Sequence, residues 1–300
     1  MPNPMTITEP SSTSVVKNSR FDISNMTLTV TGEEGDAVLS AVHAVGANSQ
    51  IAIHAPTSIK NLTATGHGDQ TELYGLTALE GTITADQNVT IDGLRSETAD
   101  AWVAALEAVS GTIDLKKGAV ITHLSGDHVF AVEAFGGGRV DINSSLSLER
   151  VILENDITAT DSGTVVNVNF MTADSVFSGL TPEDPDRDHG TINLRFDNGA
   201  TWNVSEDNTL HGTLTLHEGV VVLGDAASSR IATRAASAPV TLTIDNIAKA
   251  SRPGWAASSA GSSSTKKAEA SVRRRCTPVG RGNSRATTAS RSTVWNSRIG

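Results

Sequence analysis

Short strand-like phrases recur between Ser49 and Leu216, and this repetition limits the folds available to the chain. Each phrase starts with a small residue and continues with alternating β-branched or aliphatic side chains, as in Gly81–Ala85, Gly111–Leu115 and Gly190–Leu194. The leading glycines, at positions 81, 111, 138, 163, 190 and 212, lie 22 to 30 residues apart. Self-similarity at such a period is typical of solenoids, in which each repeat packs only on its neighbours.

Two further phrases accompany the first phrase within a repeat. Members of the phrase that precedes it are Asp36–Ala44, Leu73–Leu79, Ala101–Ala108 and His128–Ala134. Members of the phrase that follows it are Asn88–Ile91, Ala119–Thr122 and Leu146–Leu148. Each repeat therefore offers about three short strands, separated by Gly, Asn, Asp or Ser turn residues.

The fixed order of three phrases predicts an all-β parallel β-helix, in which each coil of three strands stacks on the next coil. An antiparallel sandwich also has short strands with turn signals, but it needs no such order. Residues 96–110 are an exception, because Ala99, Trp102, Val103 and Leu106 have helical spacing. Their place in the repeat favours a strand, with a helical bulge as the alternative.

The charge of the chain is divided unevenly along its length. Residues 1–248 carry 12 Lys and Arg against 32 Asp and Glu, whereas residues 249–300 carry 11 basic side chains against Glu269 alone. The acidic part would repel nucleic acid and anionic membranes. The single cysteine, Cys276, excludes a disulfide within the chain.

Residues 178–224 carry the most specific pattern. Gly190–Phe196 is followed by Asp197–Val204, then by Asn208–Leu210 and Leu214–Leu216. This order resembles the C-terminal end of bacterial autotransporter passenger domains of the pertactin-like and AIDA-like type. The resemblance covers residues 21–247 and is strongest over 190–216.

The resemblance implies a right-handed parallel β-helix over residues 21–247, after a lead-in of residues 1–20. It also implies that residues 178–247 form autochaperone-like C-terminal rungs, which Trp202 is expected to cap. In this family a signal peptide precedes the passenger and an outer-membrane barrel follows it. Because the sequence shows neither a signal-peptide pattern nor a barrel pattern, we expect a fragment of such a protein.

Residues 248–300 change in composition, and Ser, Arg, Ala, Gly and Thr make up 37 of the 52 residues after Ala248. Three interpretations remain open. The first is translation in the wrong reading frame, which would produce such a composition. The second is a basic arm, which would be disordered because it has few large apolar residues. The third is a small folded domain.

Candidate chemistry is sparse. Residues 183–189, Glu-Asp-Pro-Asp-Arg-Asp-His, offer oxygen ligands for calcium, but an EF-type loop would need Gly where His189 stands and Glu where Arg195 stands. A solvated acidic loop is the alternative. Gly66–Asp69 is similar to a Gly-His-Gly motif of pectin-cleaving β-helix hydrolases, yet it lacks their paired aspartates and reads as a turn. Six further histidines lack metal spacing, and of these His211 and His217 are expected to face solvent.

The sequence thus predicts no catalytic, cofactor-binding or metal-binding residue, and no cofactor. By resemblance the expected function is that of a non-enzymatic adhesin or structural stalk, on the bacterial cell surface, at the outer membrane or secreted. Expected partners are host-cell or matrix glycans and proteins, together with the outer-membrane barrel and its assembly machinery, and no nucleic acid. The alternatives are a polysaccharide-cleaving β-helix lyase or hydrolase and a non-functional, truncated or frameshifted fragment.

Overall fold

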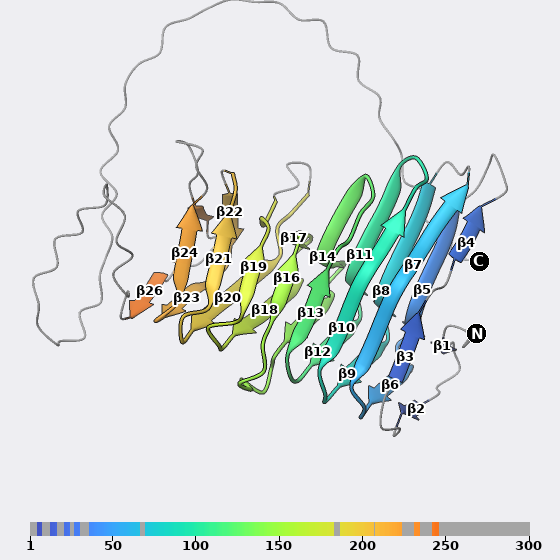
Figure 1. The fold of residues 1–300 in the computed structure, drawn as a ribbon, viewed down its shortest axis with the longest axis horizontal. Coiled ribbons are helices and arrows are strands. Elements are labelled where there is room, and N and C mark those ends of the chain that lie inside the picture. Colours follow the sequence, from blue (N-terminus) through green and yellow to red (C-terminus); the bar gives the residue numbers. More distant parts are fainter. Residues whose placement is uncertain are drawn as a thin grey trace, which may run out of the picture. The chain divides into compact units, whose positions relative to one another are not determined.

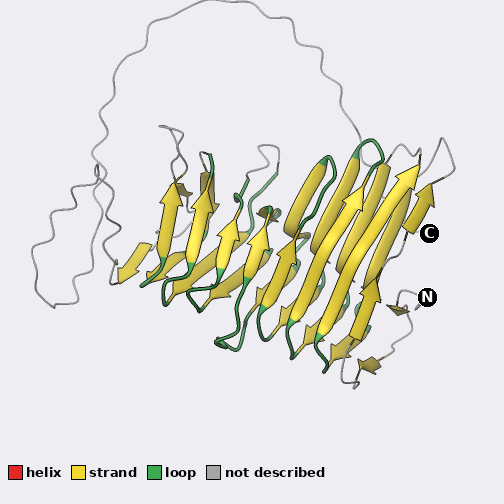
Figure 2. Cartoon of the chain, in the orientation of Figure 1, coloured by secondary structure: helices red, strands yellow, loops and turns green. Residues whose placement is uncertain are grey.

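The structure of the chain is a computed structural model that describes residues 5–7, 13–16, 21–24, 27–30, 36–66, 70–182, 187–206, 208–223, 231–234 and 242–245. Within these residues every regular element is a strand, and none is a helix (Figure 2). Consequently no helix long and apolar enough to cross a membrane occurs in the described part.

The strands form three long sheets and one short sheet. Sheet A contains, in spatial order, β1 (Met5–Ile7), β5 (Asp36–Val45), β8 (Gln70–Leu79), β11 (Ala101–Val109), β14 (His128–Phe135) and β17 (Asp156–Ala159). Sheet B contains β2 (Thr13–Val16), β6 (Gln50–Ile53), β9 (Thr82–Ala85), β12 (Thr112–Leu115), β15 (Arg139–Ile142), β18 (Val165–Phe170), β20 (Thr191–Asp197), β23 (Leu214–His217) and β26 (Leu242–Asp245).

Sheet C contains β3 (Phe21–Ser24) and β4 (Thr27–Val30), which both pair with β7 (Thr57–Gly66), followed by β10 (Val89–Ser96), β13 (Ala119–Thr122), β16 (Ile152–Glu154), β19 (Val176–Ser178), β21 (Thr201–Val204) and β24 (Val220–Leu223). The short sheet pairs β22 (Asn208–His211) with β25 (Ile231–Arg234). From β5 to β19 the chain visits sheets A, B and C in turn, and each strand pairs in parallel with the equivalent strand of the next coil (Figure 1).

The prediction of an all-β fold of stacked parallel strands is therefore confirmed. Residues 101–109 form strand β11, so the position in the repeat prevails over the helical spacing. Packing between coils overrides the helix propensity of this segment, because its side chains stack on those of β8 and β14. This stacking buries its Ala, Val and Leu residues. Strands β1 and β2, in the expected lead-in, pair with β5 and β6.

The core is a set of in-register rows of aliphatic side chains. In sheet B, Ile51, Ile83, Ile113 and Val140 follow one another on successive coils, and each is at most 1% exposed. The alternate positions face outward, which gives the strands their period of two. Stacking of like residues on like thus repeats the same packing in every coil.

The leading glycines mark the corner between sheets A and B, with two corrections. Register places Ser49, Gly81, Gly111, Gly138, Thr164 and Gly190 at the same corner. Gly163 therefore lies one residue too early, and Gly212 lies two residues late, because β23 pairs with the second half of β20. A Cβ at Gly111 would lie 2.4 Å from the Ala78 carbonyl oxygen, which explains the small residue.

One predicted strand was wrong. Residues 146–148 lie in a turn, and sheet C resumes only at β16. The buried Asn143 side chain holds this turn, since its Nδ2 donates to the Ser147 carbonyl (3.0 Å) and its Oδ1 accepts from the Ser147 amide (2.8 Å). Leu146 takes a positive φ of 54°, and Leu148 is 76% exposed.

Candidate functional site

The outer face of sheet A carries polar side chains in register on successive coils. One row runs through His43, Thr77, Glu107, Glu133 and Thr158. Solvent would be the expected surroundings of such a row, because the core lies on the other face of the sheet. Instead Glu107 is only 6% exposed and Glu133 only 8%. Burial of two stacked carboxyl groups is the feature that marks this face as a candidate site.

A bend in the strands of sheet A accounts for this burial. In β8 two successive residues, Gly75 and Leu76, face the core, which breaks the alternation of the strand. A Cβ at Gly75 would lie 2.9 Å from the core atom Cδ1 of Ile91, so only a small residue fits there. On the outer face the flanking side chains converge, as shown by the hydrogen bond of 3.1 Å from Ser40 Oγ to Thr77 Oγ1.

A second outward row joins the first across this bend. It contains Ser40, Tyr74, Ala104 and Phe130, and Tyr74 is 4% exposed. The Tyr74 hydroxyl donates to Glu72 Oε2 at 3.1 Å and is also hydrogen bonded to Glu107. We call Glu72, Tyr74, Trp102, Glu107 and Glu133 the carboxyl cluster.

Aromatic rings cover the cluster on one side. The Trp102 ring lies 4.8 Å from the ring of His128 and 5.2 Å from that of Phe130, at an angle of 35° to each. Its Nε1 donates a hydrogen bond to Glu133 Oε2. The half-buried indole thus links one carboxyl group to an aromatic surface, an arrangement that excludes water from the carboxyl group.

Burial controls the protonation of the cluster. It raises the pKa of Glu107 to about 8, and the Glu133 carboxyl adds to this shift. Burial also raises the pKa of Glu133 to about 7, against the Trp102 hydrogen bond, which favours the ionised form. Burial and the neighbouring Glu107 raise the pKa of Tyr74, which stays a neutral donor. Carboxyl groups that keep a proton near neutral pH can act as general acids or as hydrogen-bond donors.

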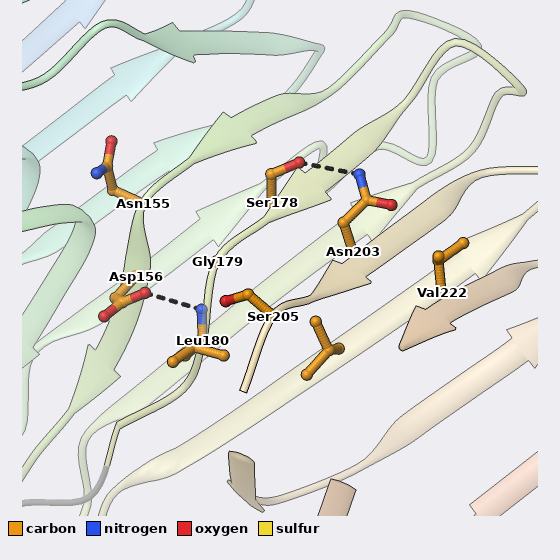
Figure 3. Close-up of a pocket in the computed structure, with 9 residues that line it drawn as sticks. Asn155, Asp156, Ser178, Gly179, Leu180, Asn203, Ser205 and Val222 are labelled. Atoms are coloured by element: carbon orange, nitrogen blue, oxygen red, sulfur yellow. Dashed lines mark hydrogen bonds between the residues drawn. The ribbon is translucent and has the colours of Figure 1, made fainter. Parts of the chain in front are cut away.

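A pocket lies at the corner between sheets C and A, further along the stack (Figure 3). Its volume is about 430 Å³, and its lining comes from consecutive coils. There Leu180 N donates to Asp156 Oδ1 at 2.8 Å, and Asn203 Nδ2 donates to Ser178 Oγ at 3.0 Å. Burial raises the pKa of Asp156, against the Leu180 hydrogen bond. Two pairs of polar groups that line the pocket are thus hydrogen bonded to each other, and Asp156 is the one carboxyl group in its lining, whereas the carboxyl cluster contains three.

The sequence-derived candidates are not brought together. Residues 183–186 of the acidic loop and residues 67–69 of the Gly-His-Gly motif lie outside the described residues. Of the loop, Asp188 accepts a backbone hydrogen bond from Asp161 N (2.7 Å), and the His189 ring stacks on that of His211 at 3.9 Å. No group of three or more potential metal ligands occurs among the residues that the structure describes.

Two exposed histidines each lie next to an aspartate. His54 Nδ1 lies 2.6 Å from Asp86 Oδ2, and His123 Nδ1 lies 2.8 Å from Asp92 Oδ1. His211 and His217 are half-buried, so the expectation that they face solvent is only partly met. His43 is also half-buried, and burial lowers its pKa.

The carboxyl cluster was missed in the sequence, although a signal for it was present. Glu107 and Glu133 occupy equivalent places in the phrases Ala101–Ala108 and His128–Ala134, each between two small or aliphatic residues. Alignment of the two phrases would have placed the glutamates on adjacent coils. Their burial was not accessible in this way, because it depends on the bend at Gly75 and Ala105.

Comparison with known proteins adds no assignment to this geometry. No protein-family model matches the chain, and no curated protein and no solved structure matches it either.

Proposed function

We propose that the chain is the passenger of an autotransporter, a right-handed β-helix that acts as a non-enzymatic adhesin or structural stalk. It would be displayed on the bacterial surface, at the outer membrane or secreted, with the help of an outer-membrane barrel and its assembly machinery. Residues 178–247 would serve as autochaperone-like rungs. Residues 248–300, which lie outside the described residues, would be a basic tail or the product of out-of-frame translation.

The observation that supports this proposal is the outward row of sheet B. Thr84, Asp114, Asp141, Asn167 and Asn193 follow one another in register on successive coils. Asn167 Nδ2 donates to Asp141 Oδ1 (2.6 Å), and Asn193 Nδ2 donates to Asn167 Oδ1 (2.8 Å). A solenoid that repeats one polar side chain per coil suits multivalent contact with glycans or proteins of a host surface.

Binding of the full chain to arrays of host glycans and matrix proteins tests the proposal. We expect saturable binding to at least one glycan or protein, and weaker binding after Asp114→Ala and Asp141→Ala, which remove the charge of the row. Glu80→Ala, at the exposed residue that directly follows β8, is the control that removes a charge away from this row. Absence of binding to every glycan and protein on the arrays would contradict an adhesive role.

A polysaccharide-cleaving enzyme is the second candidate, and the carboxyl cluster favours it. Two carboxyl groups on adjacent coils, next to the rings of Trp102 and Phe130, are the residue types that glycoside cleavage uses. Assays with pectin, alginate and similar polymers distinguish the candidates. Turnover that is lost in Glu133→Gln, with the fold retained, would replace the adhesin by an enzyme.

Resequencing of the coding DNA across the codon of Ile247 tests the remaining alternative. A second reading frame that encodes further Gly-rich rungs would identify residues 248–300 as the product of out-of-frame translation. The present frame, if confirmed, would favour the basic tail.

A further inference from the structure

Glu107 and Glu133 stack directly on each other on neighbouring strands. They are a register pair of β11 and β14, so their backbones are about 4.8 Å apart, and both side chains leave the same face. Like charges that stand directly opposite in a sheet destabilise it, and burial increases their repulsion. Two ionised carboxylates at this place are therefore costly, whereas one or two protonated carboxyl groups are not.

The hydrogen-bond donors around the pair favour the ionised carboxylates, but they are few. Tyr74 has a single hydroxyl proton for two carboxyl groups, those of Glu72 and Glu107. Thr77 is hydrogen bonded to Glu107, and Trp102 donates to Glu133. A proton on Glu107 adds the donor that this arrangement lacks.

Few charges near the pair oppose this conclusion. On β8 the charged or titratable neighbours are Glu72, which favours the neutral form of Glu107, and Tyr74, whose hydrogen bond favours the ionised form. On β5 the row continues with His43, which lies two coils away and whose pKa burial lowers. Arg187 favours the ionised form of Glu133, but it is about half-exposed, and its effect on the pKa of Glu133 is smaller than that of burial. His128 faces Trp102, and on β17 Asp156 is the register partner of Phe130.

We propose that Glu107 and Glu133 form a proton-dependent lock that couples the packing of β8, β11 and β14 to pH. Below neutral pH the pair carries protons, and the outer face of sheet A is closely packed. At alkaline pH the two carboxylates repel each other, and the three strands lose part of their mutual stabilisation. The lock does not depend on whether the chain binds or cleaves a glycan.

The sign of the effect follows from the raised pKa values of the two glutamates. The folded protein holds these protons up to about pH 7 for Glu133 and about pH 8 for Glu107, whereas the unfolded chain releases them near the ordinary value of 4.5. Their contribution to stability is complete below the ordinary pKa and is lost as the pH rises through the raised values. His43 acts in the opposite direction, because its pKa is lowered.

The test is the urea midpoint of the full chain between pH 5 and pH 9, compared with the double variant Glu107→Gln and Glu133→Gln. Glutamine mimics the neutral carboxyl group. We expect the midpoint of the parent to fall relative to that of the double variant as the pH rises from about 5 to about 8. Glu80→Gln, at the exposed residue that directly follows β8, should keep the profile of the parent. A constant difference between parent and double variant across this range would overturn the lock.

A second measurement covers the case in which the double variant does not fold. Carbon-13 NMR of the parent, labelled at the glutamate carboxyl groups, should show two resonances that titrate near pH 7 to 8. Each should be assigned by its loss in one single variant. Titration of every glutamate at acidic pH would contradict the proposal and would leave the adhesive role untouched.

Discussion

The ring of Phe196 lies on the ring of Phe170 at a centroid distance of 4.5 Å and an angle of 1°. These residues are a register pair of β18 and β20, and Phe177 and Trp202 are a register pair of β19 and β21. The two pairs meet in the core, where the rings of Phe196 and Trp202 are 6.0 Å apart. Four aromatic rings thus fill the later coils, where the earlier coils use aliphatic side chains.

Trp202 is an internal member of this aromatic core. It is fully buried, its Nε1 donates to the Gly179 carbonyl oxygen at 3.1 Å, and Val221 of β24 covers it on the next coil. The expected cap is therefore a core residue, because the coils continue beyond it.

Trp202→Ala should lower the free energy of unfolding by about 3 kcal/mol, since it removes the largest buried side chain and leaves a cavity. Urea denaturation followed by circular dichroism measures the loss. Trp202→Phe keeps the ring stacking and should lose only about 1 kcal/mol, the contribution of the indole hydrogen bond. Equal midpoints for Trp202→Ala and the parent would contradict the buried position.

Gly138→Ala should destabilise the corner between β14 and β15 by about 3 kcal/mol. Its Cβ would lie 2.1 Å from the Ala108 carbonyl oxygen, which belongs to the backbone of the preceding coil and cannot move aside. Gly137→Ala is the matched control, because nothing lies within 4 Å of its Cβ and only its positive φ of 82° is unfavourable. Its expected cost is about 1 kcal/mol. A larger loss for the control than for Gly138→Ala would refute the close approach of the coils.

The corner between sheets A and B shows how much of the fold could be predicted from the sequence. Four of the six leading glycines stand where register requires a small residue, because contact between coils imposes the same demand on every repeat. Thr164 takes this place on one coil, and a pattern of glycines could not reveal it. The turn at Asn143 was missed for a similar reason. It is held by the four hydrogen bonds of one side chain, and the spacing of apolar residues does not reveal such bonds. The candidate site was the least accessible, because an outward glutamate in a strand is ordinarily solvated.

Calcium should leave the melting temperature of the full chain unchanged. Among the described residues of the acidic loop, Arg187 lies 4.0 Å from Asp161, and the Asp188 carbonyl is already occupied by the Asp161 amide. Neither the glycine nor the final glutamate of an EF-type loop is present. Thermal denaturation in millimolar calcium chloride and in EDTA checks this. A melting temperature that rises with calcium, and does not rise with magnesium at equal ionic strength, would establish a site and exclude the solvated loop.

Asn167→Asp should destabilise sheet B at neutral pH by about 1 kcal/mol, although it changes almost no volume. The Asn167 amide donates to Asp141, and a carboxylate in its place would repel that residue and lose the donor. The new carboxyl group would have a raised pKa in the folded state, so its cost should disappear as the pH falls below about 4. Asn193→Asp is the control, because its register neighbour is the uncharged Asn167. Urea midpoints at pH 7 and pH 4 measure both variants. A loss for Asn167→Asp that is the same at both pH values would show that the row of sheet B is not coupled through charge, and the contact surface that it offers would then consist of independent side chains.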